Sequence, residues 1–81
     1  MTSKPMPLTM ARPGEAVTVV NITAGWGLQR RLSDMGLLPG TKIRVINCQM
    51  PGPVLIDLRG SRVALGRGAA QKIMVTRTQD G

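Results

Sequence analysis

Few side chains in this sequence could take part in acid–base, nucleophilic or metal chemistry. The 81-residue chain has one cysteine, Cys48, and no histidine. Without histidine, the group that most often acts as a base near neutral pH is missing, and a Cys–His nucleophile cannot form. The carboxylates stand far apart in the sequence, at Glu15, Asp34, Asp57 and Asp80. We therefore expect a protein that is not an enzyme and requires no cofactor.

The sequence allows one weak metal site. If a Pro-Gly pair turns the chain tightly between strands over 41–49 and 54–59, Cys48 and Asp57 become diagonal neighbours on the outer face of the sheet. Two such ligands could hold a divalent ion such as Fe²⁺ or Zn²⁺ weakly, but they do not close a structural site. The alternative is a partly buried Cys48 and a solvated Asp57 that bind no metal.

The net charge indicates an anionic partner. Eleven Lys and Arg residues face four carboxylates, which gives a formal charge of +7. Such an excess favours nucleic acid, an anionic lipid surface or an acidic protein. A basic band could include Arg30, Arg31, Arg44, Arg59, Arg62, Arg67 and Lys72. Single-strand binding normally also uses aromatic platforms, and the chain has one aromatic residue, so we expect no direct nucleic-acid binding. A basic nucleic-acid-binding barrel and a divalent-metal-binding regulatory module remain the two alternative functions.

Trp26 is the one aromatic residue, and its position in a predicted helix suggests two roles. Helical spacing places it on the side of Arg30 and away from Leu28 and Leu32. An exposed Trp beside an Arg is the composition of an interface anchor. The alternative is a Trp that covers one end of a small core. The same spacing predicts an exposed ion pair between Arg30 and Asp34, at i and i+4.

The helix itself is predicted from an apolar stripe. Leu28, Leu32 and Met35 fall at i, i+4 and i+7, which places them on one face. Gly36 is the expected end of the helix, because positive φ costs glycine little. The following Pro39-Gly40 pair suits the two central positions of a type II turn.

Short β-branched runs predict about five strands around this helix. They cover residues 16–22, 41–49, 54–59, 62–65 and 72–75. In the expected register Arg44 opposes Arg59 on a basic outer face, and the core face carries Ile43, Val45, Asn47, Val54, Ile56 and Leu58. This is a mainly β fold, a small SH3-like barrel over residues 16–76 with one short helix between its first two strands. Residues 1–15 are expected to be a flexible or edge-pairing arm, and residues 77–81 a frayed tail.

The central segment resembles a known family. "RRLSDMGLLPGTKIRV", a Pro-Gly hairpin, an Arg-Gly pair and "VALGRGAAQKIMV" resemble the ferrous iron transport protein A (FeoA) family from about residue 16 to residue 75. The most specific positions are Arg31, Leu32, Met35, Gly36, Leu37, Pro39 and Gly40. The resemblance implies an SH3-like barrel, also found as the C-terminal domain of diphtheria-toxin-repressor-type metal-dependent regulators.

The resemblance also implies a role in ferrous iron uptake. It indicates a small cytoplasmic protein that binds the large ferrous-iron permease, whose cytoplasmic part is a GTPase domain, and that modulates transport. The residues expected to contact this partner are Trp26, Arg30, Arg44, Arg59 and Arg62. No run of about 18 apolar residues is present, so contact with the inner face of the cytoplasmic membrane is expected only through the partner. A homodimer is a further expectation.

Overall fold

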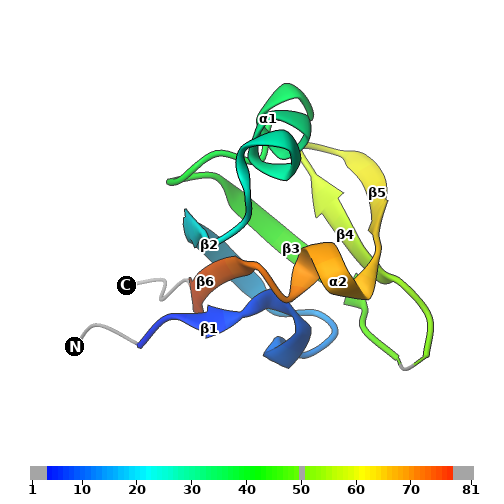
Figure 1. The fold of residues 1–81 in the computed structure, drawn as a ribbon. Helices are drawn as coiled ribbons and strands as arrows, with labels where there is room; N and C mark the ends of the chain where they lie inside the picture. Colours follow the sequence, from blue (N-terminus) through cyan, green and yellow to red (C-terminus); the bar gives the residue numbers. More distant parts are fainter. Residues whose placement is uncertain (1–3, 50, 78–81) are drawn as a thin grey trace.

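A computed structural model describes residues 4–49 and 51–77 as one curled antiparallel sheet with helix α1 packed over one end (Figure 1). The strand order is β1-β6-β2-β3-β4-β5. In chain order the elements are β1 (Met6–Pro7), the 3₁₀ helix η1 (Leu8–Met10), β2 (Ala16–Ile22), α1 (Trp26–Asp34), β3 (Lys42–Asn47), β4 (Val54–Leu58), β5 (Ser61–Leu65), α2 (Arg67–Ala70) and β6 (Ile73–Arg77). The prediction of a mainly β, SH3-like domain is confirmed, and β1 adds a strand to the predicted set.

The N-terminal segment is part of the folded domain rather than a flexible arm. Strand β1 pairs with β6 at one edge of the sheet, with Met6 opposite Val75. The next residue, Leu8, is fully buried, and Ala11 is 4% exposed. The edge-pairing alternative predicted for residues 1–15 is therefore the one that the structure shows, whereas the burial of Leu8 and Ala11 was not predicted. At the other terminus, the strand includes Arg77, and the rest of the expected tail, residues 78–81, lies outside the described residues.

Helix α1 ends in a Schellman motif, as the glycine predicts. Gly36 has φ +97° and donates its N–H to the Ser33 carbonyl at 2.9 Å, while Leu37 donates to the Leu32 carbonyl at 2.9 Å. This motif brings the residue two positions after the C-cap against the last turn of the helix. Leu32 and Leu37 are 2% and 0% exposed as a result. Met35, the last residue of the predicted apolar stripe, is the C-cap residue and is 41% exposed, so it is not buried as the stripe suggests.

The turn after this motif ties the helix to the sheet. Thr41 donates its N–H to the Leu38 carbonyl at 3.0 Å and Gly40 has φ +94°, which is the type II turn predicted for the Pro39-Gly40 pair. Gly40 in turn donates to the Val19 carbonyl of β2 at 2.6 Å. The motif over residues 36–40 therefore sets the path from α1 into β3.

The predicted register between the two central strands is wrong. Val45 lies opposite Ile56, and Asn47 opposite Leu55, with a shift between these pairs. This irregularity at Ile46 leaves Asn47 exposed, although Asn47 was expected in the core. Asn47 Oδ1 accepts a hydrogen bond from the Gln49 N–H at 3.1 Å, so the chain begins to turn before the Pro-Gly pair. The other core residues of the two strands are as predicted. Arg44 pairs with Asp57 instead of Arg59, a shift of two residues, and an even shift keeps the same side chains on the buried face.

The carboxylate of Glu15 joins the start of β2 to the end of β6. Its Oε1 accepts the Arg12 backbone N–H at 2.7 Å, and its Oε2 accepts a hydrogen bond from Arg77 Nε. The Arg12 N–H first, and Arg77 after it, hold the pKa of Glu15 below its ordinary value of 4.5. A carboxylate whose pKa is lower in the folded state adds stability above its unfolded pKa. This contribution is lost as the pH falls through the folded pKa.

We therefore expect the melting temperature of Glu15→Gln to fall less steeply than that of the parent as the solution becomes acidic. The variant should melt slightly below the parent at pH 7 and converge with it between about pH 5 and pH 3. Thermal melts followed by circular dichroism across this range check the prediction. Asp34→Asn, which removes an exposed carboxylate, is the control. A constant difference in melting temperature at all pH values would contradict the assignment.

Candidate functional site

Trp26 forms an exposed pair with Arg30 on α1. The Trp26 residue is 76% exposed, and the Arg30 guanidinium carbon lies 5.4 Å from the centre of the indole ring. A cation at this distance over an indole contributes about 0.5–1 kcal/mol at an exposed site. The expected ion pair of Arg30 with Asp34 is not among the ion pairs of residues 4–49 and 51–77. The alternative in which Trp26 covers the core is also wrong, since the ring lies outside the core cluster.

Hydrogen bonds of Gln29 fix the helix that carries this pair. Gln29 Nε2 donates to the carbonyls of Ile22 at 3.2 Å and Ala24 at 2.9 Å, which close the connection from β2. A shallow hollow of about 220 Å³ continues from Gln29 to the half-exposed Leu38. Trp26 therefore stands on a helix that hydrogen bonds tie to the end of β2, beside further apolar surface, which suits an interface anchor.

A row of charged residues crosses the outer face of the sheet. Asp57 on β4 lies opposite Arg44 on β3 and opposite Arg62 on β5. The Asp57 carboxylate accepts the Gly60 N–H at 2.8 Å, and Arg44 Nη1 donates to the Gly14 carbonyl at 3.0 Å. The Arg44 side chain therefore holds the loop before β2 in place, and it also adds a positive charge to this face. Arg62 is exposed and makes no hydrogen bond or ion pair within the described part of the chain.

The hairpin between β4 and β5 presents Arg59 next to this row. Leu58 pairs with Ser61, so Arg59 and Gly60 form the two-residue turn, rather than the predicted Gly60-Ser61. Their φ angles are +54° and +88°, the signature of a type I′ turn. An arginine at positive φ is strained, and such strain at an exposed position is a reason to look for a functional role.

We expect Arg59→Asn to stabilise the protein. Asparagine tolerates positive φ, so the free energy of unfolding should rise by about 0.5–1 kcal/mol in urea titrations. If Arg59 contacts the partner, the same variant should bind it more weakly, and the two measurements should move in opposite directions. Arg59→Lys, which retains the charge and the strain, is the control. A loss of stability in Arg59→Asn would contradict the turn assignment.

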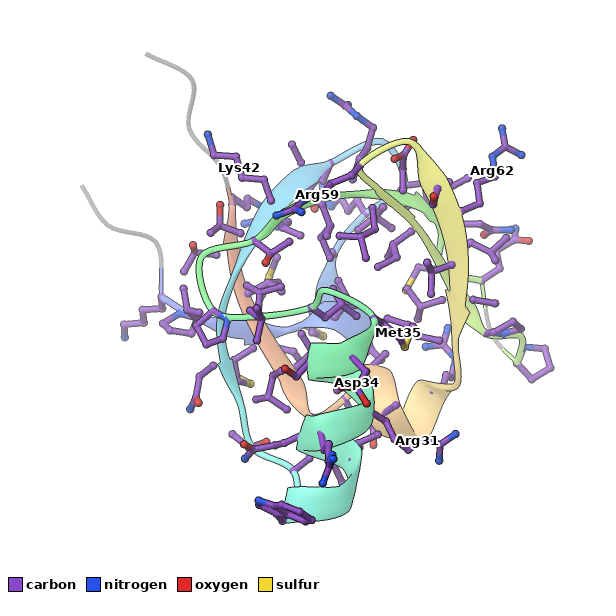
Figure 2. All side chains as sticks on the ribbon, turned by 90° about the horizontal axis from the view of Figure 1, so that it is seen from above. Arg31, Asp34, Met35, Lys42, Arg59 and Arg62 are labelled. Atoms are coloured by element: carbon purple, nitrogen blue, oxygen red, sulfur yellow. The ribbon has the colours of Figure 1, made fainter. Side chains whose placement is uncertain are left out.

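The structure separates the predicted partner residues into two groups. Figure 2 places Lys42, Arg59 and Arg62 on the side of the barrel away from α1, while Arg31 and Asp34 belong to α1. We call Lys42, Arg44, Arg59 and Arg62 the cationic face, and Trp26 with Arg30 the Trp–Arg pair. Lys42 was missed because the expected register placed Arg44, rather than Lys42, beside Arg59. In the observed register Arg44 lies opposite Asp57, and continuing this register by two residues places Lys42 at the level of Arg59.

The register also removes the basis for a metal site at Cys48 and Asp57. Cys48 packs against the core cluster, and its Sγ donates to the Thr9 carbonyl at 3.4 Å. Asp57 faces outward and caps the turn at Gly60. No group of three or more His, Cys, Asp or Glu side chains that could hold a metal ion occurs among residues 4–49 and 51–77.

Within the ranges that the structure covers, no helix combines the length and apolar character that a membrane span requires. The nine-residue α1 has charged residues on its exposed side.

A small antiparallel barrel with one helix between its second and third strands is the architecture of SH3-like domains. The helix stop at Gly36 and the Pro39-Gly40 turn hold this helix on the barrel. The chain matches the FeoA domain family over residues 6–77. It therefore belongs to the FeoA family, as the motif over residues 31–40 indicates.

Relatives and solved structures agree with this assignment. A candidate Fe(2+) transport protein A of Methanocaldococcus jannaschii is 48% identical over 75 residues, which are 93% of this chain and 90% of the relative. The crystal structure of an iron uptake regulatory protein (FeoA) matches with a TM-score of 0.86 and 37% identity, over 93% of this chain and all (100%) of the other. A manganese-dependent transcriptional repressor matches with a TM-score of 0.85 and 26% identity, over 96% of this chain and 44% of the repressor.

Proposed function

We propose that this protein is a small cytoplasmic accessory factor of ferrous iron uptake that binds the GTPase-containing ferrous-iron permease and modulates transport. Membership of the FeoA family and the Fe(2+) transport name of its 48% identical relative support this proposal. In it, ferrous iron is the cargo of the permease, and the protein itself requires no cofactor. It reaches the inner face of the membrane through its partner.

The observation that carries the proposal is the exposed Trp–Arg pair. Trp26 is 76% exposed and lies outside the core cluster, so its indole offers a large apolar area to a partner. Buried aromatic anchors slow dissociation, whereas exposed charges mainly steer association. We therefore assign affinity to Trp26 and attraction toward an acidic permease surface to the cationic face.

Substitutions in the Trp–Arg pair and in the cationic face should change different rate constants of binding to the cytoplasmic part of the permease. Trp26→Ala should raise the dissociation rate by about 30-fold, the effect of losing an anchor worth about 2 kcal/mol. Arg62→Glu should lower the association rate, and the difference should shrink as salt is added. Arg62 is preferred to Arg44 because Arg44 also bonds to Gly14. Surface plasmon resonance at several salt concentrations measures both rates.

Met10→Ala is the matched control for these variants, because Met10 is 66% exposed and belongs to η1. It should bind as the parent does. Unchanged rates in both Trp26→Ala and Arg62→Glu would remove the interface assignment. Absence of binding by the parent protein would remove the permease as partner. Gel shifts with single-stranded RNA test the alternative, and tight binding that survives added salt would favour it.

A further inference from the structure

The two edges of the sheet are built differently. One edge is β1, which has two residues and includes Pro7. Short edge strands and proline are devices that prevent pairing with another chain. The other edge is β5, which pairs with β4 over five consecutive residues without a bulge and contains no proline. Figure 1 shows β5 at the side of the molecule with no strand beyond it. Apart from the charge of the exposed Arg62, this edge has none of these protective features.

The hairpin geometry identifies the backbone groups that β5 leaves free. In a two-residue hairpin the closing pair, Leu58 with Ser61, exchanges both hydrogen bonds, and every second pair after it does the same. Ser61, Val63 and Leu65 therefore bond to β4. The N–H and C=O groups of Arg62 and Ala64 point away from it, toward the open edge.

An apolar hollow lies beside this open edge. It has a volume of about 210 Å³ and lies between α1 and the end of β5 with the start of α2. Leu28 and Met35 line it from the helix, and Ala64, Gly66 and Ala69 line it from the other side. These small residues leave the space that a larger side chain would fill. Met35 is 41% exposed here, so its side chain remains available for contact.

Arginines stand at both ends of the same edge. Arg31 lines the hollow and is exposed, and Figure 2 shows it on the side of α1 that faces α2. Arg62 extends from β5 itself and points away from the barrel in the same view. Neither guanidinium has a hydrogen bond or ion pair within the described residues. A segment lying along β5 would therefore pass between two free cations.

We propose that the open edge of β5 takes up an extended segment of the partner as an additional strand. The backbone groups of Arg62 and Ala64 pair with this segment, one apolar side chain fills the hollow at Met35, and acidic residues on either side meet Arg31 and Arg62. The inference rests on the proposed permease partner. An acidic segment is favoured over a second copy of this chain, because each copy carries +7.

Hydrogen exchange tests the pairing directly. With the cytoplasmic part of the permease bound, the amides of Arg62 and Ala64 should exchange at least about tenfold more slowly than in the free protein. The amides of β1 should exchange as before. Binding without protection of β5 would overturn this inference and leave the permease as partner, whereas no binding at all would overturn both. Protection of β5 that rises with the concentration of the free protein would assign the edge to a second copy instead.

Two substitutions at Ala64 separate the backbone from the side chain. Ala64→Pro removes the outward N–H but leaves the bonds to β4, and it should weaken permease binding by about tenfold. Ala64→Ser keeps the N–H and almost the same size, and it should bind within about twofold of the parent. If Ala64→Pro does not fold, Arg31→Glu provides the test and should weaken binding by a similar factor. Equal binding by Ala64→Pro, Ala64→Ser and Arg31→Glu would overturn the proposal.

Discussion

Leu37→Ala is expected to lower the free energy of unfolding by about 3 kcal/mol, within the range for deleting a fully buried leucine side chain. The side chain of Leu37 is 0% exposed and closes the Schellman motif against Leu32. A domain of 81 residues has a total stability of about 4–12 kcal/mol. One substitution just after the helix should therefore remove a large part of the stability of the whole barrel.

The neighbouring leucine provides the control for this prediction. Leu38 is 48% exposed, and Leu38→Ala should change the free energy of unfolding by about 0.5 kcal/mol or less. Urea titrations followed by circular dichroism measure both variants. Similar losses in Leu37→Ala and Leu38→Ala would show that the turn does not direct one leucine inward and the other outward.

The second large effect is expected at Leu8, in the N-terminal segment. Leu8 is 0% exposed under the sheet edge formed by β1 and β6, so Leu8→Ala should also lower the free energy of unfolding by about 2–4 kcal/mol. Met10, two residues later on the same 3₁₀ helix, is 66% exposed, and Met10→Ala should have almost no effect.

This pair of variants decides whether the N-terminal segment belongs to the core. Thermal melts and urea titrations should give a large loss for Leu8→Ala and a negligible one for Met10→Ala. A loss below about 1 kcal/mol for Leu8→Ala would mean that the segment detaches easily, as an arm would.

Local sequence patterns were sufficient for the features that depend on one element. The end of α1 at Gly36, the type II turn and the outward side of Trp26 follow from helix spacing and glycine φ. Met35 was expected on the apolar face of the helix, but it is the C-cap residue and is 41% exposed. One residue past the end, the chain direction changes, and Leu37 occupies the buried position instead.

Features that depend on pairing between strands or on contacts between elements were harder to predict from the sequence. The alternation of apolar and polar residues shows which face of β3 is buried. It does not show the irregularity at Ile46, or which residue of β4 lies opposite each residue of β3. The neighbours of Asp57 changed for this reason from a presumed Cys48 to Arg44 and Arg62. The hollow beside β5 could not be predicted, because its walls come from α1, β5 and α2 and meet only in the folded barrel.

The exposure of the one aromatic residue has an optical consequence. The chain has no Tyr and no Phe, so ultraviolet absorbance near 280 nm and intrinsic fluorescence come from Trp26. The residue is 76% exposed in the folded state, and unfolding therefore changes its surroundings little. The emission of this protein should remain almost constant through denaturation and shift to shorter wavelength when a partner covers the indole. Trp26 fluorescence should therefore report the binding of a partner and change little when the protein unfolds.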